Sequence, residues 1–367
     1  MTEKNSTNRE ALIKIANLVR PALASAAYIP ALTHICFDGE YATAYNDISA
    51  IAVRAKVPVE RCIPGELLIR ALNSFGADQI MFQEGKDGAL VLSSGRGRVK
   101  LPTLEQKAFP YSPPDPEKDR GAVAIAIDGG IIKGIERCLL SVNSDPTFPA
   151  QMGVTLDCGQ DGFAVLYSTD NFTISRYQTK TEIDLPGDAP VILPRFFCEQ
   201  MLSLARAFPE EKIKLWLIGG ALFAEFGRQA ELFSKTPAEI EPLNFRAIVD
   251  KHVKLGKLKD QLFSIPNAWD SAFQRAMLVL SAEDDKATKI TLAAGVINLH
   301  STSDMGDADD QIPYDSADDD PRDPFHVDPT YVIRALKSCS MLGFTERVLI
   351  LADGDLNFLH IIAHCSK

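Results

Sequence analysis

Apolar residues recur at helical spacing in a segment near the middle of the chain. The positions that share one face of this expected helix are Phe197, Met201, Leu204 and Phe208. An apolar, strand-like run precedes the helix at 191–193, and two more follow it at 212–218 and 221–226, separated by a Gly-Gly turn. The pattern therefore predicts the order strand, helix, strand, turn, strand.

The same unit occurs three times along the chain. Each copy has a proline at or next to the expected start of its helix, and these residues are Pro64, Pro194 and Pro329. A proline-rich linker is expected at 101–120, and a second connection near 250–257. Because the period is too long for a solenoid repeat, it indicates three similar domains. Their expected boundaries are 1–120, 121–250 and 251–367.

Each expected domain also has an earlier helix, so it contains two halves, each made of a helix and several strands. These first helices are expected at 9–25, 130–142 and 267–280. The fold class is therefore α+β. Arginines recur in register in the first helices at Arg20, Arg137 and Arg275. In the second helices Arg70 and Arg334 are in register, with Gln200 between them. Ordinary solvated helix charges are one explanation, but the register across the repeats favours a functional surface.

Composition narrows the class of protein. The chain has 367 residues, 46% of them hydrophobic, which is ordinary for a globular protein of two or three domains. Residues 1–10 have no apolar core of a signal peptide, and no apolar run reaches the length of a membrane span. The seven cysteines occur singly, without a CxxC pair, which favours structural thiols in a reducing cytoplasm over a zinc site.

The negative charge is concentrated in one segment. The net charge is −11, and residues 303–323 carry nine aspartates and one arginine, a net of −8. The remainder of the chain therefore sums to only −3. We expect an acidic loop here. It has neither the glycine nor the terminal glutamate of an EF-hand, so a solvated loop is favoured over a calcium site.

Motifs of enzymatic chemistry are absent from the sequence. Gly95–Arg98 lacks the Lys-Ser/Thr of a phosphate-binding loop, the histidines lack HExxH spacing, and there is no Gly-x-Ser-x-Gly. Asp170 could be a catalytic carboxylate, but a turn residue that fixes a strand end is the favoured interpretation. We expect no enzyme activity, no metal and no cofactor.

Several segments together carry a resemblance to a known family. They are the three proline-led helices, Tyr167–Asp170, Asn244–Ile248 and the chain end His360–Lys367. No single segment is specific for a family. The order of the segments, the chain length and the triple repeat are specific when they are taken together. On these grounds the whole chain resembles the bacterial-type DNA polymerase III beta subunit, the sliding clamp.

The resemblance implies a fold and a function. The DNA clamp fold has three similar domains, each of two βαβββ halves. Two chains close head to tail into a ring, with helices inside and sheets outside. Such a homodimer is a processivity factor that encircles duplex DNA non-specifically and topologically. It tethers the replicative DNA polymerase, and a clamp loader places it on DNA. The expected localisation is cytoplasmic, without membrane contact.

The resemblance also assigns residues to DNA and to the subunit contact. Phosphates need scattered cations rather than base-reading groups. The residues expected to face DNA are Arg20, Arg70, Lys133, Arg137, Arg275, Arg334 and Lys337. The dimer contact is expected to join a basic edge, 96–100, to the acidic 304–310. Its expected residues are Arg96, Val99, Leu101, Leu278, Val279, Asp307 and Asp309. A loop that only keeps the protein soluble is the alternative role of the acidic residues.

A partner-peptide pocket is implied between the second and third domains. Its expected residues are Met152, Thr169, Phe172, Ile174, Leu243, Ile248, Ile361, Ala363 and Cys365. Two pocket segments depart from the family pattern. Asn171–Ile174 replaces a Gly-His-Arg-Leu-like run, and Ala363–Lys367 replaces a Met-Pro-Met-Arg-Leu-like tail. Phe172 adds bulk, whereas Ala363 and Cys365 remove it, so we expect a reshaped pocket in a divergent or phage-encoded member.

Two other functions stay open at this point. A clamp-like decoy would bind partners without encircling DNA. An ion-dependent hydrolase would use the aspartate-rich segment. A dimer that stays on circular DNA until the DNA is cut distinguishes the clamp from both.

Overall fold

The computed structural model shows two compact units, each built from separate parts of the chain. The first unit is Met1–Asp128 with Phe196–Glu239, and the second is Gly129–Arg195 with Ile240–Lys367. The structure describes residues 6–85, 88–119, 121–185, 189–236, 240–280, 287–293, 295–314 and 323–365. The two units are described one at a time below.

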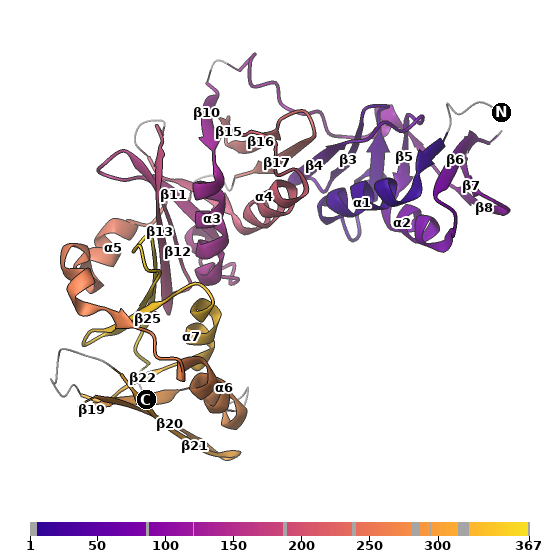
Figure 1. The fold of residues 1–367 in the computed structure, drawn as a ribbon. Helices are drawn as coiled ribbons and strands as arrows, with labels where there is room; N and C mark the ends of the chain where they lie inside the picture. Colours follow the sequence, from indigo (N-terminus) through magenta and orange to yellow (C-terminus); the bar gives the residue numbers. More distant parts are fainter. Residues whose placement is uncertain are drawn as a thin grey trace. The chain divides into compact units, whose positions relative to one another are not determined.

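The first unit has two antiparallel sheets. The four-stranded sheet has the order β1 (Ser6–Asn8), β6 (Gln79–Glu84), β7 (Leu90–Ser94), β8 (Gly97–Leu101). The nine-stranded sheet has the order β10 (Val123–Ile127), β15 (Ile213–Ile218), β16 (Ala221–Phe226), β17 (Ala230–Lys235), β4 (Ser49–Arg54), β3 (Tyr41–Tyr45), β2 (His34–Phe37), β5 (Arg61–Pro64), β9 (Leu104–Glu105). Its helices are α1 (Arg9–Val19), α2 (Gly65–Ser74) and nearly all of α4 (Arg195–Ala207). Helices α1 and α2 lie side by side (Figure 1).

Helix α1 shows how local sequence sets its ends. The side chain of Asn8 caps the helix by accepting a 2.9 Å hydrogen bond from the backbone N–H of Ala11. Leu12, Ala16 and Val19 are fully buried on one face. The expected helix to residue 25 is too long, because Pro21 has no N–H to continue the helical ladder. The chain instead forms a short 3-10 turn, Arg20–Ala22.

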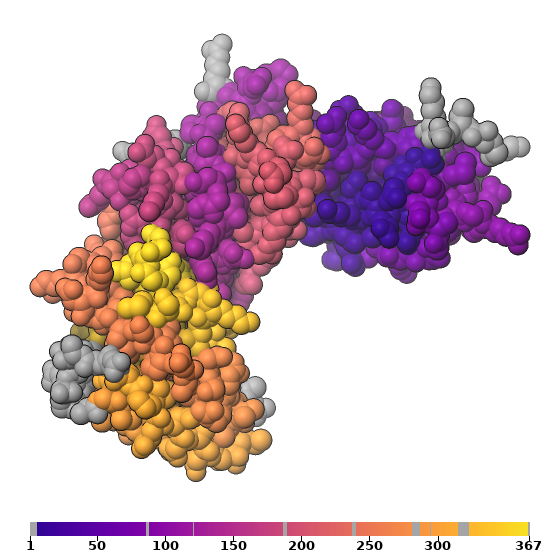
Figure 2. Space-filling model, viewed as in Figure 1, coloured from indigo at the N-terminus to yellow at the C-terminus, as the bar shows by residue number. Residues whose placement is uncertain are grey.

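The second unit also has two antiparallel sheets. The eight-stranded sheet has the order β14 (Val191–Pro194), β11 (Gly153–Cys158), β12 (Phe163–Thr169), β13 (Thr173–Glu182), β25 (Phe358–Ala363), β24 (Val348–Ala352), β23 (Met341–Phe344), β18 (Phe263–Ser264). The four-stranded sheet has the order β21 (Gly306–Pro313), β20 (Val296–Ser303), β19 (Thr288–Ala293), β22 (Phe325–Val327). Its helices are α3 (Gly129–Cys138), α5 (Phe245–His252), α6 (Trp269–Val279) and α7 (Pro329–Leu336). In Figure 2 the yellow C-terminal residues lie against the magenta residues that begin this unit.

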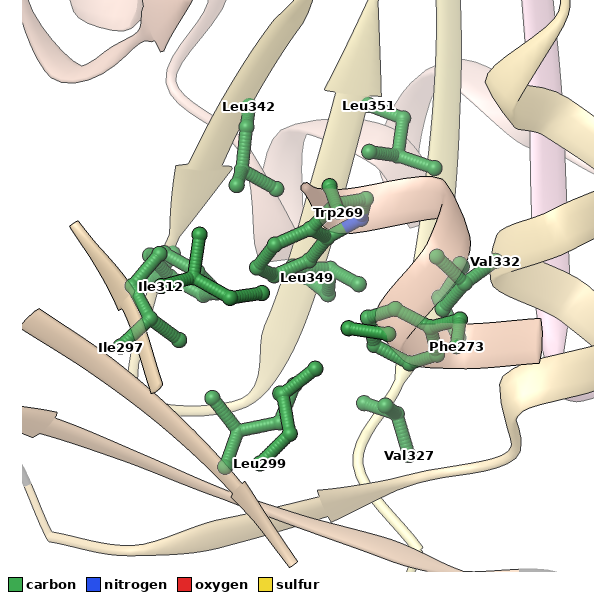
Figure 3. Close-up of a cluster of buried hydrophobic side chains, with 14 of the residues drawn as sticks. Trp269, Phe273, Ile297, Leu299, Ile312, Val327, Val332, Leu342, Leu349 and Leu351 are labelled. Carbon is green, nitrogen blue, oxygen red and sulfur yellow. The ribbon is translucent and has the colours of Figure 1, made fainter. Parts of the chain in front are cut away.

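The core of the second unit forms where helices α6 and α7 cover both of its sheets. Trp269 and Phe273 of α6 are fully buried, with ring centroids 4.9 Å apart. Figure 3 shows them between side chains of β20, β24 and α7, among them Leu299, Leu349 and Val332. Each aromatic side chain removes a large apolar area from water, so these two dominate the burial on α6.

The three prolines of the repeated unit do not have one common role. Pro64 and Pro194 are the last residues of strands β5 and β14, and only Pro329 lies in the first turn of its helix. Pro194 would suit the first turn of its helix, and that placement is wrong by one residue, because α4 begins at Arg195. Strand β14 is at the edge of its sheet, where a residue without an N–H is tolerated.

Both large sheets continue across the expected domain boundaries. Strand β17 pairs with β4 at Leu232 and Ile51, and β13 pairs with β25 at Ile174 and Ile361. The division into three domains stays a prediction.

The acidic segment is not a loop throughout. Its residues 306–313 form strand β21, which pairs with β20 from Ser303↔Gly306 to Val296↔Pro313. The loop assignment is therefore wrong for this part, because pairing with β20 and the burial of Ile312 make it a strand. Residues 315–322 of the segment lie outside the described residues.

Candidate functional site

The first unit carries two of the expected DNA-facing cations. Arg20 and Arg70 are both exposed and lie beside Glu66 of helix α2. The Arg20 guanidinium forms a two-point ion pair with the Glu66 carboxylate at 2.6 and 2.9 Å. Arg70 Nε lies 3.4 Å from the Glu66 carbonyl oxygen. One carboxylate therefore offsets part of the positive charge on this helix pair.

The other expected cations lie on three helices of the second unit. Lys133 and Arg137 are on α3, Arg275 is on α6, and Arg334 and Lys337 are at the end of α7. Arg137 and Arg334 lie over aromatic rings, 5.6 Å from the Phe358 centroid and 5.4 Å from the Tyr331 centroid.

Arg275, like Arg20 in the first unit, is paired with a carboxylate. Its guanidinium contacts both carboxylate oxygens of Asp310 on β21, with Nε–O distances of 3.0 and 3.2 Å and a third contact at 2.5 Å. This hydrogen bonding raises the pKa of Arg275. Most of its charge is thus offset within the chain. Asp310 lies in the acidic segment 304–310 expected at the dimer contact, but its ion pair with Arg275 was not predicted.

Each unit has a small sheet whose outer strand has one neighbour in the described part of the chain. Strand β8 pairs with β7, and its exposed residues include Arg98 and Lys100. Strand β21 pairs with β20 and exposes Asp307 and Asp309. These two strands are called the basic edge and the acidic edge below. The backbone groups along an open strand edge can pair with a strand of another chain.

Apolar residues accompany the acidic edge. Leu278, at the end of α6, is 80% exposed, and Met305 in the β20–β21 turn is 73% exposed. Val279 is half-buried, and its carbonyl oxygen accepts a hydrogen bond from Ser303. Leu101 on the basic edge is fully buried, so its side chain belongs to the core of its own unit. Met305 was missed because a single methionine in an acidic run carries no periodic signal.

The expected pocket residues all lie in the second unit. The turn between β12 and β13 positions the first of them. Asp170 Oδ1 accepts hydrogen bonds from the backbone N–H groups of Phe172 and Thr173, at 3.1 and 2.7 Å. Asn171 adopts a φ of 74°, which asparagine tolerates in a tight turn. Asp170 thus serves the turn, and Phe172 is left 57% exposed at its tip.

Strand pairing brings the distant pocket segments together. Ile174 lies opposite Ile361, and the backbone N–H of Ala363 donates to the Phe172 carbonyl oxygen at 2.8 Å. Leu243 and Ile174 pack on a buried cluster that contains Ile361. Ile248 is half-buried on α5, and Thr169 is buried. The region formed by these residues is called the partner cleft below.

Aromatic stacking shapes one side of the partner cleft. The ring of Phe172 stacks on Tyr331 of α7, with centroids 6.0 Å apart and an interplanar angle of 16°. A cavity of about 610 Å³ lies beside this stack, and its wall also includes Arg195 and Arg334. Burial, followed by the charges of Asp170 and Asp328, raises the pKa of Tyr331 to about 12. Sequence reasoning missed Tyr331, although its place in the third proline-led helix could have suggested it.

The chain end is held against the same unit. The His364 ring stacks on Phe325 at 4.1 Å, and the Cys365 N–H donates to the His326 carbonyl oxygen at 2.8 Å. Met152, 36% exposed, follows Gln151, whose side-chain amide donates to Asn171 at 2.7 Å. The structure thus places every segment expected at the pocket in one unit. Residues 366–367 lie outside the described part.

A buried polar network lies behind the Asp170 turn. The His360 ring nitrogen Nδ1 and the Ser175 hydroxyl are 2.9 Å apart, and the hydroxyls of Ser175 and Ser141 are also 2.9 Å apart. Thr173 connects Ser141 to Asp170 through contacts of 2.8 and 2.9 Å. Burial lowers the pKa of His360 to about 4. The neutral imidazole is therefore part of the packed interior.

Two searches within the described residues gave negative results. No cluster of three or more His, Cys, Asp or Glu side chains there could hold a metal ion. No helix in that part of the chain is long and apolar enough to cross a membrane.

Two of the three comparisons with known proteins found similar proteins. No protein-family model matches the chain. The beta sliding clamp of Caulobacter vibrioides is 25% identical over 313 residues, which cover 81% of this chain and 80% of the relative.

Solved structures extend the likeness to the whole chain. The Caulobacter crescentus beta sliding clamp matches with a TM-score of 0.82 and 19% identity, covering 99% of this chain and 98% of that one. The Thermotoga maritima DNA polymerase III beta subunit matches with 0.82 and 15%, covering 99% of both. The Bartonella birtlesii sliding clamp, solved with griselimycin bound, matches with 0.83 and 16%, also covering 99% of both. The predicted resemblance and the clamp fold are therefore confirmed.

Proposed function

We propose that this chain, which has the fold of DNA polymerase III beta subunits, is a DNA polymerase processivity factor. Two copies form a ring around duplex DNA. The ring slides, and it tethers the replicative polymerase and other partners. The curated relative named above, from Caulobacter vibrioides, is itself a sliding clamp. A clamp is a scaffold, so we propose no catalytic role, and we place the protein in the cytoplasm with a clamp loader as a further partner.

The observation that carries the proposal is the pair of oppositely charged sheet edges. The basic edge exposes Arg98 and Lys100, whereas the acidic edge exposes Asp307 and Asp309. Strand pairing between β8 of one copy and β21 of another would satisfy both rows of backbone groups. Like edges repel, so head-to-tail pairing is favoured over head-to-head pairing. Because each copy has one edge of each kind, the contact can repeat until the assembly closes.

Apolar contacts would add to the charge attraction at this proposed junction between copies. Leu278 and Met305 are the most exposed large apolar side chains of the second unit in the described part of the chain. Their burial against a second copy would stabilise the dimer by about 25 cal/mol for each Å² removed from water. Val279 and Val99 are half-buried and would lie at the margin.

DNA binding in this proposal rests on dispersed cations. The remaining expected cations, Arg70, Lys133, Arg137, Arg334 and Lys337, lie on α2, α3 and α7 or at its end. Among the described residues, no carboxylate lies within ion-pair distance of these five. Exposed charges contribute little individually and weaken with salt. Many weak phosphate contacts let a ring slide while it stays on DNA.

The partner cleft supplies the tether. Its apolar residues are Ile174 and Leu243, which are partly exposed and pack on the buried Ile361, and Phe172 and Tyr331 form an aromatic side. An apolar cleft with few polar groups suits the aliphatic and aromatic anchors of a short peptide.

Retention on circular DNA tests the proposal directly. The protein is loaded on nicked circular DNA and separated from free protein by gel filtration. The clamp should travel with the circle and leave once a restriction enzyme has cut it. A Leu278→Asp variant, which cannot close the ring, serves as the control and should not be retained. A wild-type dimer that binds polymerase peptide but never stays on circles would instead establish the partner-binding decoy.

A further inference from the structure

Two cysteines lie directly opposite each other in the nine-stranded sheet. Strands β2 and β5 are antiparallel, and their register pairs are His34↔Pro64, Ile35↔Ile63 and Cys36↔Cys62. Facing residues on neighbouring antiparallel strands project to the same side of the sheet. Both thiols are buried, with Cys36 5% exposed and Cys62 0% exposed, and neither is in a disulfide.

Pro64 reveals which kind of pair the two cysteines form. Proline has no N–H, so His34 and Pro64 cannot exchange the two hydrogen bonds of a hydrogen-bonded pair. Because the two kinds of pair alternate along an antiparallel ladder, Cys36 and Cys62 also form a non-hydrogen-bonded pair. Such pairs have Cα atoms about 4.5 Å apart. Disulfides occur at Cα separations of about 4.4 to 6.8 Å.

The chemistry of the two thiols is linked. A hydrogen bond with Cys62, followed by burial, raises the pKa of Cys36, and the same hydrogen bond lowers the pKa of Cys62. Cys62 Sγ also lies 3.8 Å from the Glu105 carbonyl oxygen. Cys36 is therefore the proton donor of the pair, and Cys62 is the sulfur that more readily becomes a thiolate.

A cavity gives Cys36 access to small molecules. It has a volume of about 240 Å³ and is lined by Cys36, Asp38, Thr43 and Tyr111, among others. One water molecule occupies about 30 Å³ in the liquid, so peroxide fits easily. Cys62 does not line this cavity and lies behind Cys36.

We propose that Cys36 and Cys62 are a modification site at which a peroxide forms an intramolecular, reversible disulfide. The proton shared by the two sulfurs first moves from Cys36 to Cys62, and the Cys36 thiolate so formed attacks one oxygen of hydrogen peroxide. The S–O bond forms, the O–O bond breaks, and hydroxide leaves. Cys62 sulfur then attacks the resulting sulfenic acid of Cys36, the S–S bond forms, the S–O bond breaks, and water leaves. The two sulfurs lose two electrons and peroxide is reduced to water.

The disulfide would connect β2 to the strand that leads into α2. Cys62 lies three residues before Gly65, the first residue of that helix. A covalent link at this point removes the freedom of β5 to separate from β2 during local unfolding. Oxidation should therefore increase the protection of this sheet end against hydrogen exchange.

Thiol counting and peptide mapping test the site on the full-length protein. Native protein is treated with hydrogen peroxide and then alkylated. The expected product has lost two hydrogen atoms in intact mass and two alkylatable thiols, and dithiothreitol restores both. Trypsin should release residues 15–54 linked to residues 62–70, because cleavage after Arg20 is blocked by Pro21. The link should form equally at low and high protein concentration.

Variants separate this pair from the other cysteines. Cys36→Ser and Cys62→Ser should each abolish the linked peptide, whereas Cys198→Ser, in helix α4, should leave it intact. The proposal is overturned if folded wild-type protein keeps all its thiols under oxidant. It is equally overturned if the linked peptides involve other cysteines, or if the link forms only in denaturant. Because mapping of the wild type decides these outcomes, a variant that fails to fold does not remove the test.

Discussion

The Arg275 guanidinium on helix α6 forms a two-point ion pair with the Asp310 carboxylate on edge strand β21. The Arg275 side chain is about half exposed, whereas Asp310 is 17% exposed. On the basis of the family resemblance, Arg275 was expected to face DNA. The contact adds a second role, since the same side chain fixes the strand that we propose as the subunit junction.

Replacing Arg275 by Met should weaken the dimer more than it weakens folding. The change leaves the Asp310 charge without its partner and frees β21 from α6. An exposed ion pair contributes little by itself, so the dimer dissociation constant should rise by about fivefold at most. Sedimentation velocity over a concentration series measures this. Lys133→Met on α3 is the matched control and should leave the constant unchanged. Equal constants for both variants would show that the ion pair does not position the edge.

Leu278→Asp should give a folded monomer. The side chain is 80% exposed in one copy, so an aspartate there is solvated and changes the free energy of unfolding by less than about 0.5 kcal/mol. In the dimer the same carboxylate would be buried next to apolar groups, which is costly. Ile48→Asp, in the exposed turn between β3 and β4, is the control and should stay dimeric. An unchanged Leu278→Asp dimer places the junction elsewhere.

Ile174→Asp should abolish binding of a peptide from the cognate polymerase while the dimer persists. Ile174 packs on the apolar cluster of the partner cleft, and a carboxylate there would have no partner when a peptide covers it. Titration of a fluorescent peptide measures the affinity. Full affinity of this variant would remove the site from the partner cleft.

Phe172→Ala tests the aromatic side of the cleft separately. It removes the ring that stacks on Tyr331 and should lower affinity by about tenfold, since such pairs contribute about 0.5–1.5 kcal/mol beyond area burial. Phe148→Ala changes another exposed phenylalanine of the same unit and serves as the control. Equal losses in the two variants would argue against a specific aromatic contact with peptide.

The buried His360 should make stability fall in mild acid. The unfolded chain takes up a proton on this residue below a pH of about 6.5, whereas the folded protein does so only near its pKa of about 4. Between these values the unfolded state holds more protons, so the free energy of unfolding decreases as the pH falls. The loss from this residue approaches about 3 kcal/mol at the lower end. Urea unfolding of wild type and His360→Gln should show a shallower pH dependence in the variant. Identical slopes would contradict the role of His360.

Much of the fold follows from periodic patterns in the sequence. The spacing of Phe197, Met201 and Leu204 predicted helix α4 almost to its ends, and all three side chains are buried. Strand β21 was missed because alternating aspartates have low strand propensity. It forms because pairing with β20 and contacts such as Arg275–Asp310 outweigh that preference, and these involve residues far apart in sequence.

The site residues could be predicted only where the family resemblance or the arginine positions repeated across the helices marked them. Segments around Thr169 and Ile361 were expected at one pocket, and β13–β25 pairing does bring them together. Met305 is a single residue in a turn and carries no periodic signal. Tyr331 lies in the third proline-led helix, but its stacking on Phe172 is a tertiary contact that the sequence pattern does not reveal. The ion pairs that engage Arg20 and Arg275 also depend on tertiary contacts that no helical spacing reveals.

The pairing of β13 with β25 has a consequence for synthesis of the chain. Strand β25, Phe358–Ala363, lies between β13 and β24 in the middle of the eight-stranded sheet, yet among the described strands it is the last one to be synthesised. Strands β11 to β13 must wait with an open edge for more than 170 residues of further translation. A chain that stops before Phe358 would retain that open edge permanently, so premature termination should yield an aggregating product rather than a shorter clamp.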